Sequence, residues 1–269
     1  MELMELPLEL LHIILVYAAL GRGVKRALRL RLVCKTFVDM VHPALFETHL
    51  MDSSRFPVGT ALWQLWNQHG ADKLWHEYLV YRVVEEKDAT VGRFVEMRQV
   101  AHAVCQETEN ALNLRATVEA LCWLVLKHGT RYENNFYDWG PIRMEQSKQK
   151  HKANLDLNLL SAAAHFDILP LAKRLLAEGH SPTSHNYLFA PPTQIAAQAG
   201  NIAILKLFQE QVPEPNFERW SVTGAAMRGD IDMLKLALRL DRGTRIRDGH
   251  GEDMKDQYFG SIGYATETG

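Results

Sequence analysis

Twelve histidines and three cysteines are the residues of this chain most suited to metal binding or nucleophilic chemistry. Cys34, Cys105 and Cys122 form no CxxC pair, so neither a zinc site nor a disulfide framework is indicated. No HExxH motif and no facial set of carboxylates occurs, and His12 and His165 lie within predicted helices as partly buried polar residues. We therefore expect no metal and no cofactor.

Motifs of nucleotide binding and of acyl transfer are also missing. The segment Gly21-Arg22-Gly23 lacks the lysine and serine of a phosphate loop, and no GxSxG elbow is present. Cys34 lies on an apolar stripe, which favours packing over nucleophilic chemistry. The sequence thus predicts a protein that is not an enzyme. An enzyme within residues 51–150 is a rival hypothesis, because catalytic residues need not be close in sequence.

Composition narrows the class of protein further. The chain has 269 residues, is 47% hydrophobic and 23% charged, and carries a formal net charge of −2. These values are typical of a globular protein and favour neither nucleic acid nor an anionic membrane as a partner. Three irregularly spaced cysteines suit a reducing compartment, which predicts a cytoplasmic and/or nuclear location.

An apolar run near the N-terminus, residues 10–20, is the one segment that resembles a targeting signal. The residues before it carry Glu2, Glu5 and Glu9 and no lysine or arginine, whereas a secretory signal has a basic start. A bilayer-spanning helix needs about 20 apolar residues, more than this run contains. We expect neither a signal peptide nor a membrane span.

The elements that must carry any function are predicted to be helices. Apolar residues recur mostly at helical spacing, and alternating β-branched runs are almost absent, so the fold class is all-α. The chain divides into residues 1–50, a helical region of unknown type at 51–150, and residues 155–269. A polar stretch at 145–152 is predicted to be an exposed connector.

The first predicted helix opens at Pro7, which is well placed in a first turn. It is apolar on nearly every side, so a unit of about 45 residues is too small to bury it alone. Something else, either the rest of the chain or a partner, must cover its second face. One face carries Leu10, Ile13, Ile14 and Tyr17, and the neighbouring face carries Leu11, Leu15 and Ala18.

A second helix is predicted after a break at Gly21 and Gly23. It runs through the basic stretch 25–38 and ends near Pro43, because proline disfavours helix in the preceding residue. Its six cations between Arg22 and Lys35 could serve nucleic-acid binding or nuclear import, but the interleaved leucines favour a solvated helix face. The predicted buried stripe is Leu30, Val33, Cys34, Phe37 and Val41.

The order and spacing of four anchors resemble the F-box family. The anchors are Leu6-Pro7-Leu8-Glu9-Leu10, the apolar run to Leu15, the segment Leu30-Arg31-Leu32-Val33-Cys34-Lys35-Thr36-Phe37, and Pro43-Ala44-Leu45-Phe46. Phe37 and Phe46 stand where tryptophan is common in the family, and the segment 18–28 is longer than its usual turn. The match covers about 41 of the 269 residues.

This resemblance implies a three-helix plug that inserts into a Skp-type adaptor and so joins a cullin–RING ubiquitin ligase. The residues of the plug and its contacts would then be Leu6, Pro7, Leu10, Ile14, Val33, Cys34 and Phe37. The alternative is that these are core positions of an ordinary three-helix unit. Which of them face outward does not follow from the pattern.

An internal repeat occupies residues 155–269. Its three copies place an alanine pair at Ala163, Ala196 and Ala225, with shifts of 33 and 29 residues. The alanines would let short inner helices approach closely, and a glycine such as Gly200 would end each inner helix in the left-handed conformation. Gly229 would do the same in the third copy and Gly179 would end the first outer helix, whereas the first inner helix carries Asp167 in place of glycine.

These copies resemble ankyrin repeats, with Thr193-Gln194-Ile195-Ala196-Ala197 the best match; another helical-pair solenoid is the alternative. A degenerate copy is predicted near 100–130, where 118–129 resembles an outer helix, and residues 261–269 resemble the start of a fourth copy. Ankyrin arrays bind proteins through turn tips and inner-helix faces. The resemblance therefore implies substrate contacts at segments such as 180–193 and 213–222.

Five aromatic residues in the middle region lie at helical spacing. Core packing is the simpler interpretation, and an exposed recognition patch is the other. They are Trp63, Trp66, Trp75, Tyr78 and Tyr81.

Together these resemblances predict a substrate-recognition subunit of a Skp–cullin–F-box ubiquitin ligase. Its F-box would bind the adaptor and its ankyrin repeats an unknown protein target, with neither nucleic acid nor membrane as a partner. The alternative function is an ankyrin interaction scaffold with no ligase role.

Overall fold

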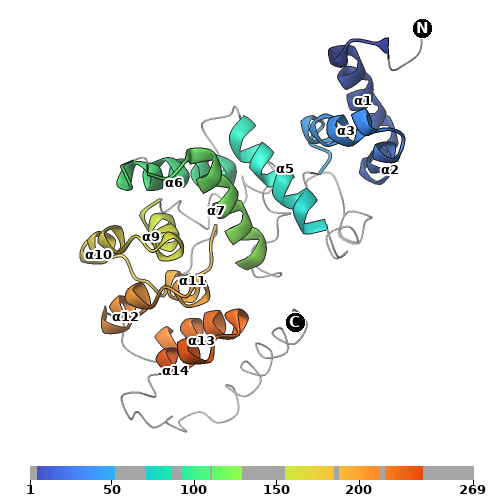
Figure 1. The fold of residues 1–269 in the computed structure, drawn as a ribbon. Helices are drawn as coiled ribbons and strands as arrows, with labels where there is room; N and C mark the ends of the chain where they lie inside the picture. The colour runs from blue at the N-terminus through green and yellow to red at the C-terminus, as the bar shows by residue number, and fades with distance from the viewer. Residues whose placement is uncertain are drawn as a thin grey trace. The chain divides into compact units, whose positions relative to one another are not determined.

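The computed structural model describes residues 5–51, 71–86, 92–109, 111–128, 155–184, 188–211 and 216–238. Throughout these ranges the chain forms helices, turns and bends and no strand, which confirms the all-α class (Figure 1). The predicted connector 145–152, Trp63, Trp66 and the start of a fourth repeat copy lie outside the described residues. No helix in the described ranges combines the length and apolar character that crossing a membrane requires.

The described residues divide into two compact units, one ending at Arg98 and the other beginning at Gln99, so that the boundary falls within α6. The first unit begins with α1 (Leu8–Arg22), α2 (Val24–Arg29), the 3₁₀ turn η2 (Leu30–Leu32), α3 (Lys35–Glu47), α5 (Ala71–Glu85) and α6 (Arg93–Glu107). The second holds α7 (Leu114–His128), α9 (Leu155–Phe166), α10 (Leu169–Ala177), α11 (Pro192–Ala199), α12 (Ile202–Gln211), α13 (Asn216–Arg228) and α14 (Ile231–Ala237).

In the first unit, α1 and α3 pack together around a small apolar core. Its buried members are Leu11, Leu15, Phe37, Val41 and Ala44. Helix α1 continues through Gly21 and ends at Gly23, whose φ of 72° is left-handed, so only the second glycine of the predicted break ends a helix.

The prediction of one continuous helix over 25–38 is wrong, because the chain breaks there into α2, η2 and α3. Cys34 is extended, with φ −160° and ψ 170°, and precedes the first turn of α3. The predicted stop near Pro43 is also wrong, because α3 continues to Glu47. Interior proline costs a helix about 3 kcal/mol. Burial of the three residues that follow Pro43, Ala44 to Phe46, outweighs that cost.

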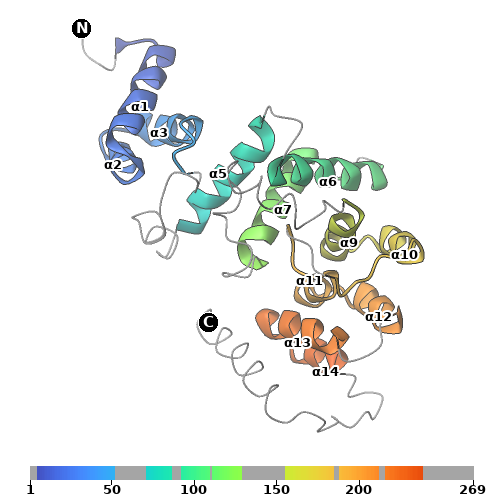
Figure 2. The ribbon, with the colours of Figure 1, turned by 180° about the vertical axis from the view of Figure 1, so that it is seen from behind.

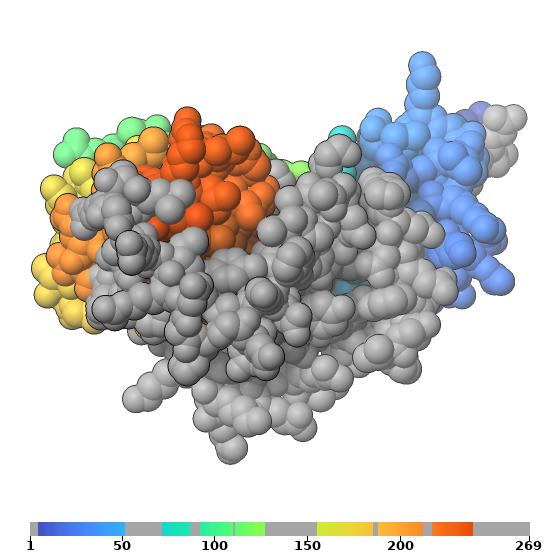
Figure 3. Space-filling view, turned by 90° about the horizontal axis from the view of Figure 1, so that it is seen from below, coloured from blue at the N-terminus to red at the C-terminus, as the bar shows by residue number. Residues whose placement is uncertain are grey.

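The second unit contains three helix pairs, α9 with α10, α11 with α12, and α13 with α14. The inner helices α9, α11 and α13 lie side by side, and α12 packs against α10 (Figures 1 and 2). Side chains of α13 and α14 contribute to the face that Figure 3 shows in orange and red. Eight consecutive residues of α9, 157–164, are buried, because neighbouring elements cover this helix all round.

The inner helices end alike. Gly200 and Gly229 take φ values of 85° and 72°, as the sequence predicted, and Asp167 adopts the same conformation with φ 57°. In each copy the next residue donates its N–H to the carbonyl of the first alanine of the pair. The three bonds are Ile168 to Ala163 at 3.0 Å, Asn201 to Ala196 at 3.0 Å and Asp230 to Ala225 at 3.3 Å.

Successive inner helices also complete one another's ends. The side-chain amide of Asn201 donates to the carbonyls of Ala164 and His165 at the end of α9, over 2.7 and 3.1 Å. Arg228 donates to the carbonyls of Gln198 and Ala199 at the end of α11, over 3.3 and 2.9 Å. Carbonyls that a helix end leaves unpaired are thus bonded by the next copy.

Ahead of the three pairs, the sequence predicted a degenerate copy with an outer helix at 118–129. The structure has a single helix there, α7, which starts earlier and ends at His128. It meets α6 through the sulfur of Cys105, which lies 3.5 Å from the hydroxyl of Thr117. At 15 residues each, α6 and α7 are longer than any helix of the three pairs.

Candidate docking surface

Helix α1 carries two apolar stripes on opposite sides. Leu11, Leu15 and Ala19, spaced by four residues, are 1%, 3% and 2% exposed and form the inner stripe against α3. The residues of the other stripe are 40–70% exposed, although every one is a large apolar side chain. We call this set the outer stripe: Leu10, Ile13, Ile14, Tyr17 and Leu20.

Two more apolar side chains are exposed where the chain leaves η2. Leu32 is 86% exposed and Val33 is 66% exposed. The extended backbone at Cys34 interrupts the helical periodicity that would have turned Val33 inward. The predicted buried stripe is therefore wrong at Val33, whereas Phe37 and Val41 belong to the core and Leu30 and Cys34 pack on it.

The structure separates the seven predicted adaptor-binding residues into two groups. Leu10, Ile14 and Val33 are exposed, as is Pro7, and Leu6 is half-buried next to them in sequence. Cys34 packs partly buried against the core, and Phe37, at 5% exposed, lies within it. The first group can meet a partner directly, while Phe37 can only support the surface from beneath.

Of the outer stripe together with Leu32 and Val33, four residues were missing from the predicted set: Ile13, Tyr17, Leu20 and Leu32. For the three on α1 a signal was available, because they lie opposite the Leu11–Leu15–Ala19 row at 100° per residue. For Leu32 none was available, since its exposure follows from a break in the helix.

Helix α5 packs on α3 rather than on the outer stripe. His42 of α3 donates from Nδ1 to Oε2 of Glu77 over 2.8 Å, and the Phe46 ring centroid lies 5.3 Å from that of Tyr78. Trp75 and Tyr78 are buried, which confirms core packing for these two of the five aromatic residues. The middle region thus holds α3 in place and leaves the outer stripe exposed.

Burial is the main cause that lowers the pKa of His42; the hydrogen bond to Glu77 opposes it, and the positive charge of Arg31 adds to it. The imidazole is therefore neutral near pH 7, and its Nε2 atom is buried without a hydrogen-bond partner in the described part of the chain. This arrangement orients α3 against α5.

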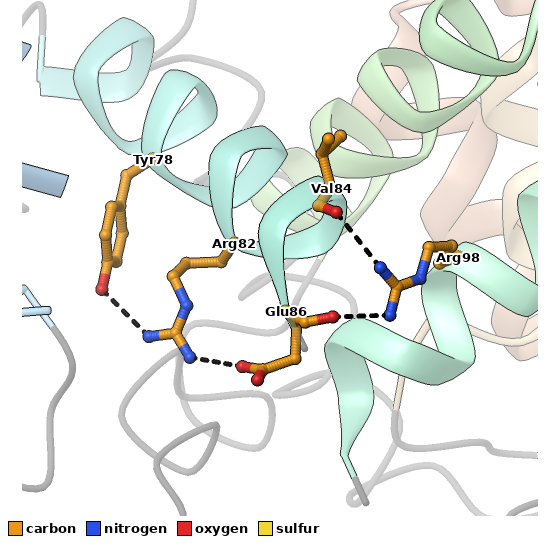
Figure 4. A network of polar contacts seen from close by, with 5 residues as sticks. All are labelled: Tyr78, Arg82, Val84, Glu86 and Arg98. Atoms are coloured by element: carbon orange, nitrogen blue, oxygen red, sulfur yellow. Dashed lines mark hydrogen bonds and ion pairs between the residues drawn. The ribbon is translucent and has the colours of Figure 1, made fainter. Parts of the chain in front are cut away.

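The titratable residues of the middle region connect helices to one another (Figure 4). Arg82, buried in α5, donates to Oε2 of Glu86 over 2.7 Å and to the Tyr78 hydroxyl over 3.3 Å, and it lies 4.7 Å from the Phe94 ring centre. Arg98 donates to the carbonyls of Val84 and Glu86 at the end of α5 over 3.1 and 2.8 Å. These contacts have a structural explanation in the joining of α5 to α6 and the capping of α5.

The segments predicted to contact a substrate are partly buried in the second unit. Of residues 180–193, those from Leu188 onward are buried, and the Thr193 hydroxyl donates to the Pro182 carbonyl over 2.8 Å. The second segment, 213–222, begins outside the described residues and continues as α13, where Phe217 and Val222 are buried. These buried residues pack within the second unit, and substrate contact by the exposed residues of the two segments stays a prediction.

A metal centre is not indicated among the described residues, where no three histidine, cysteine or acidic side chains gather closely enough to hold an ion. Compared with models of protein families, with curated proteins and with solved structures, the chain shows no match. The candidate site is the outer stripe with Leu32 and Val33, a set of large apolar side chains that are exposed.

Proposed function

We propose that this chain is a non-catalytic receptor that docks on a Skp-type adaptor and presents a bound protein to a cullin–RING ubiquitin ligase. The observation that carries the proposal is the outer stripe of α1, a row of large apolar side chains at 40–70% exposure on a helix that already buries its other side. Contiguous exposed apolar surface of this kind marks interaction sites in folded proteins.

The resemblance of residues 6–46 to the F-box family names the partner class. Four residues that the resemblance assigns to the plug and its contacts, Pro7, Leu10, Ile14 and Val33, are exposed. A docked adaptor would remove their apolar area from water, at about 25 cal/mol per Å² buried.

The helix pairs of the second unit support the second part of the proposal, the binding of a target protein. Short inner helices with alanine pairs, left-handed ends and regular stacking are the features for which residues 155–238 resemble ankyrin repeats. Such arrays commonly hold other proteins, so this unit is assigned the target.

Co-purification with a recombinant Skp-type adaptor tests the docking step. The variant Leu10→Asp/Ile14→Asp places two charges on the outer stripe, and we expect it to lose adaptor capture while keeping its helix content and melting temperature. The matched control is Ile202→Asp/Ile231→Asp, which changes two apolar residues of the second unit that are 51% and 69% exposed. It should capture adaptor as the wild type does.

Two other results would contradict the proposal, and the first of them would favour an interaction scaffold over a ligase receptor. A wild-type chain that captures no adaptor would overturn the ligase role and leave an interaction scaffold as the better description. Capture that survives the double aspartate variant would show that the adaptor binds elsewhere on the chain.

A further inference from the structure

Beside the docking surface lies a concentration of positive charge that the fold does not use. Residues 22–35 contain six cations and no acidic residue, although the whole chain has a net charge of −2. We call this set the basic arc. It consists of Arg22, Lys25, Arg26, Arg29, Arg31 and Lys35, of which all but the half-buried Arg31 are exposed.

Within the described residues, no cation of the basic arc forms an ion pair. Elsewhere cations are commonly paired. Examples are Arg82 with Glu86, Arg115 with Glu119, Arg174 with Glu107, Arg228 with Asp230 and Lys235 with Asp232. What distinguishes the basic arc is that six such cations lie within residues 22–35, with no acidic residue among them.

Stability of the helices explains only part of the basic arc. Arg22 in α1 and Arg26 and Arg29 in α2 lie in last turns, where a cation favours the helix dipole, but the other three cations have no such explanation. Lys25 and Arg29 are four residues apart, a spacing at which like charges repel on a helix surface. Lys25 also lies in the first turn of α2, where a cation opposes the helix dipole. Arg31 is one of the charges that lower the pKa of His42, so its field also acts on the contact between α3 and α5.

The basic arc is continuous in sequence with both parts of the docking surface. Leu20, at the end of the outer stripe, is followed by Arg22, while Leu32 and Val33 lie between Arg31 and Lys35. At the other end of α1 the charged side chain of the first turn is the acidic Glu9, which is exposed. The surface is therefore apolar along α1, negative at its start and positive at its end.

We propose that the basic arc recognises carboxylates along one edge of the adaptor's apolar groove, and so steers and orients docking. This inference rests on the proposed function and adds to it the charge of the partner surface. A protein with a complementary pattern fits both signs. An anionic lipid surface would meet the basic arc but repel Glu9 at the start of the same helix.

The test measures association and dissociation rates of the full chain with a recombinant Skp-type adaptor at about 0.05 and about 0.5 M salt, a range over which screening increases several-fold. For the wild type we expect association to slow as salt rises. For Arg26→Glu/Arg29→Glu we expect association at low salt to slow about tenfold or more, with dissociation nearly unchanged.

The matched control is Lys173→Glu/Lys206→Glu, which makes the same charge change at two exposed lysines of the second unit. It should leave both rates near the wild-type values. A neutralising variant, Arg26→Gln/Arg29→Gln, should give an intermediate rate. Circular dichroism and a melting curve establish that each variant is folded.

Two outcomes overturn the inference in distinguishable ways. If the adaptor binds but neither salt nor charge reversal changes association, docking stands and the acidic edge is wrong. If the wild type does not bind the adaptor, both proposals fail. Vesicles of phosphatidylserine and phosphatidylcholine that capture the wild type but not Arg26→Glu/Arg29→Glu would then assign the basic arc to a lipid surface.

Discussion

Helices α1 and α9 are both apolar on nearly every side, yet only one of them is buried. In α9 every residue from Leu157 to Ala164 is inaccessible, including Asn158 and Ser161. In α1 the buried residues are Leu11, Leu15 and Ala19, and the outer stripe remains exposed. The apolar composition of a helix therefore shows how much of its surface needs to be covered, while the number of neighbouring elements decides how much of it the chain itself covers.

The two helices differ in what packs on them. Helix α9 is the first inner helix of a stack and contacts both α10 and α11. Within its unit α1 packs on α2 and α3, and α5 attaches to α3 through His42 and Phe46 instead of covering α1. One side of α1 is therefore uncovered because of the order in which the helices pack. The proposed adaptor would cover that side, as the next helix of the stack covers an inner helix in the second unit.

The largest predicted effect is a difference in stability between substitutions in the inner stripe and in the outer stripe of α1. Leu15→Ala removes a side chain that is 3% exposed and leaves a cavity, so we expect the free energy of unfolding to fall by about 3 kcal/mol. Leu10→Ala, at 49% exposure on the same helix, should cost less than about 1 kcal/mol. Denaturant unfolding of the full chain, followed by circular dichroism, measures both.

If Leu15→Ala and Leu10→Ala lowered the free energy of unfolding equally, the division of α1 into an inner and an outer stripe would be contradicted. This result would mean that another part of the chain covers Leu10 in solution and closes the docking surface. If the division into stripes holds, adaptor binding should order the two variants oppositely, because Leu10→Ala should weaken capture while leaving the fold intact.

A second comparison uses glycines in the two regions. A Cβ at Gly224 of α13 would lie 2.2 Å from the Gln194 carbonyl oxygen and 2.9 Å from the Ala197 Cβ, both in α11. Gly224→Ala should therefore force the inner helices apart and lower the free energy of unfolding by about 2 kcal/mol, despite alanine's better helix propensity. The matched control, Gly21→Ala in α1, meets nothing within 4 Å and should be neutral or stabilising.

If Gly224→Ala were also neutral, α11 and α13 would be less closely packed than described and the second unit would resemble the first. Thermal unfolding of each variant against the wild type decides this. The close approach of Gly224 was not predicted from the sequence, because a glycine between Thr223 and Ala225 has the same appearance in a loosely packed helix.

The sequence predicted the structural features that depend on local residue patterns. It missed those that depend on packing between elements distant in sequence. Helical periodicity was sufficient for the all-α class, and the spacing of the alanine pairs was sufficient for the left-handed ends at Gly200 and Gly229. The break at Cys34 and the helical Pro43 were missed, because in both places tertiary packing outweighs local preference. For the candidate site, the residue types were predictable, and which of Leu10 and Phe37 faces outward was not.

The smallest effect concerns the one irregular copy of the repeat. Asp167 has φ 57°, the left-handed conformation that Gly200 and Gly229 adopt at equivalent positions. A side chain in that conformation costs about 1 kcal/mol relative to glycine, and Asp167 is exposed, so little packing is lost on its removal. Asp167→Gly should therefore raise the free energy of unfolding by up to about 1 kcal/mol, partly offset because glycine adds freedom to the unfolded chain.

Gly200→Asp is the reverse exchange. It should lower the free energy of unfolding by more than Asp167→Gly raises it, because a Cβ there would lie 2.7 Å from the Arg228 guanidinium that caps α11. Chemical denaturation of both variants tests the pair, and a loss of stability in Asp167→Gly would mean that the carboxylate contributes more at this helix end than its conformation costs.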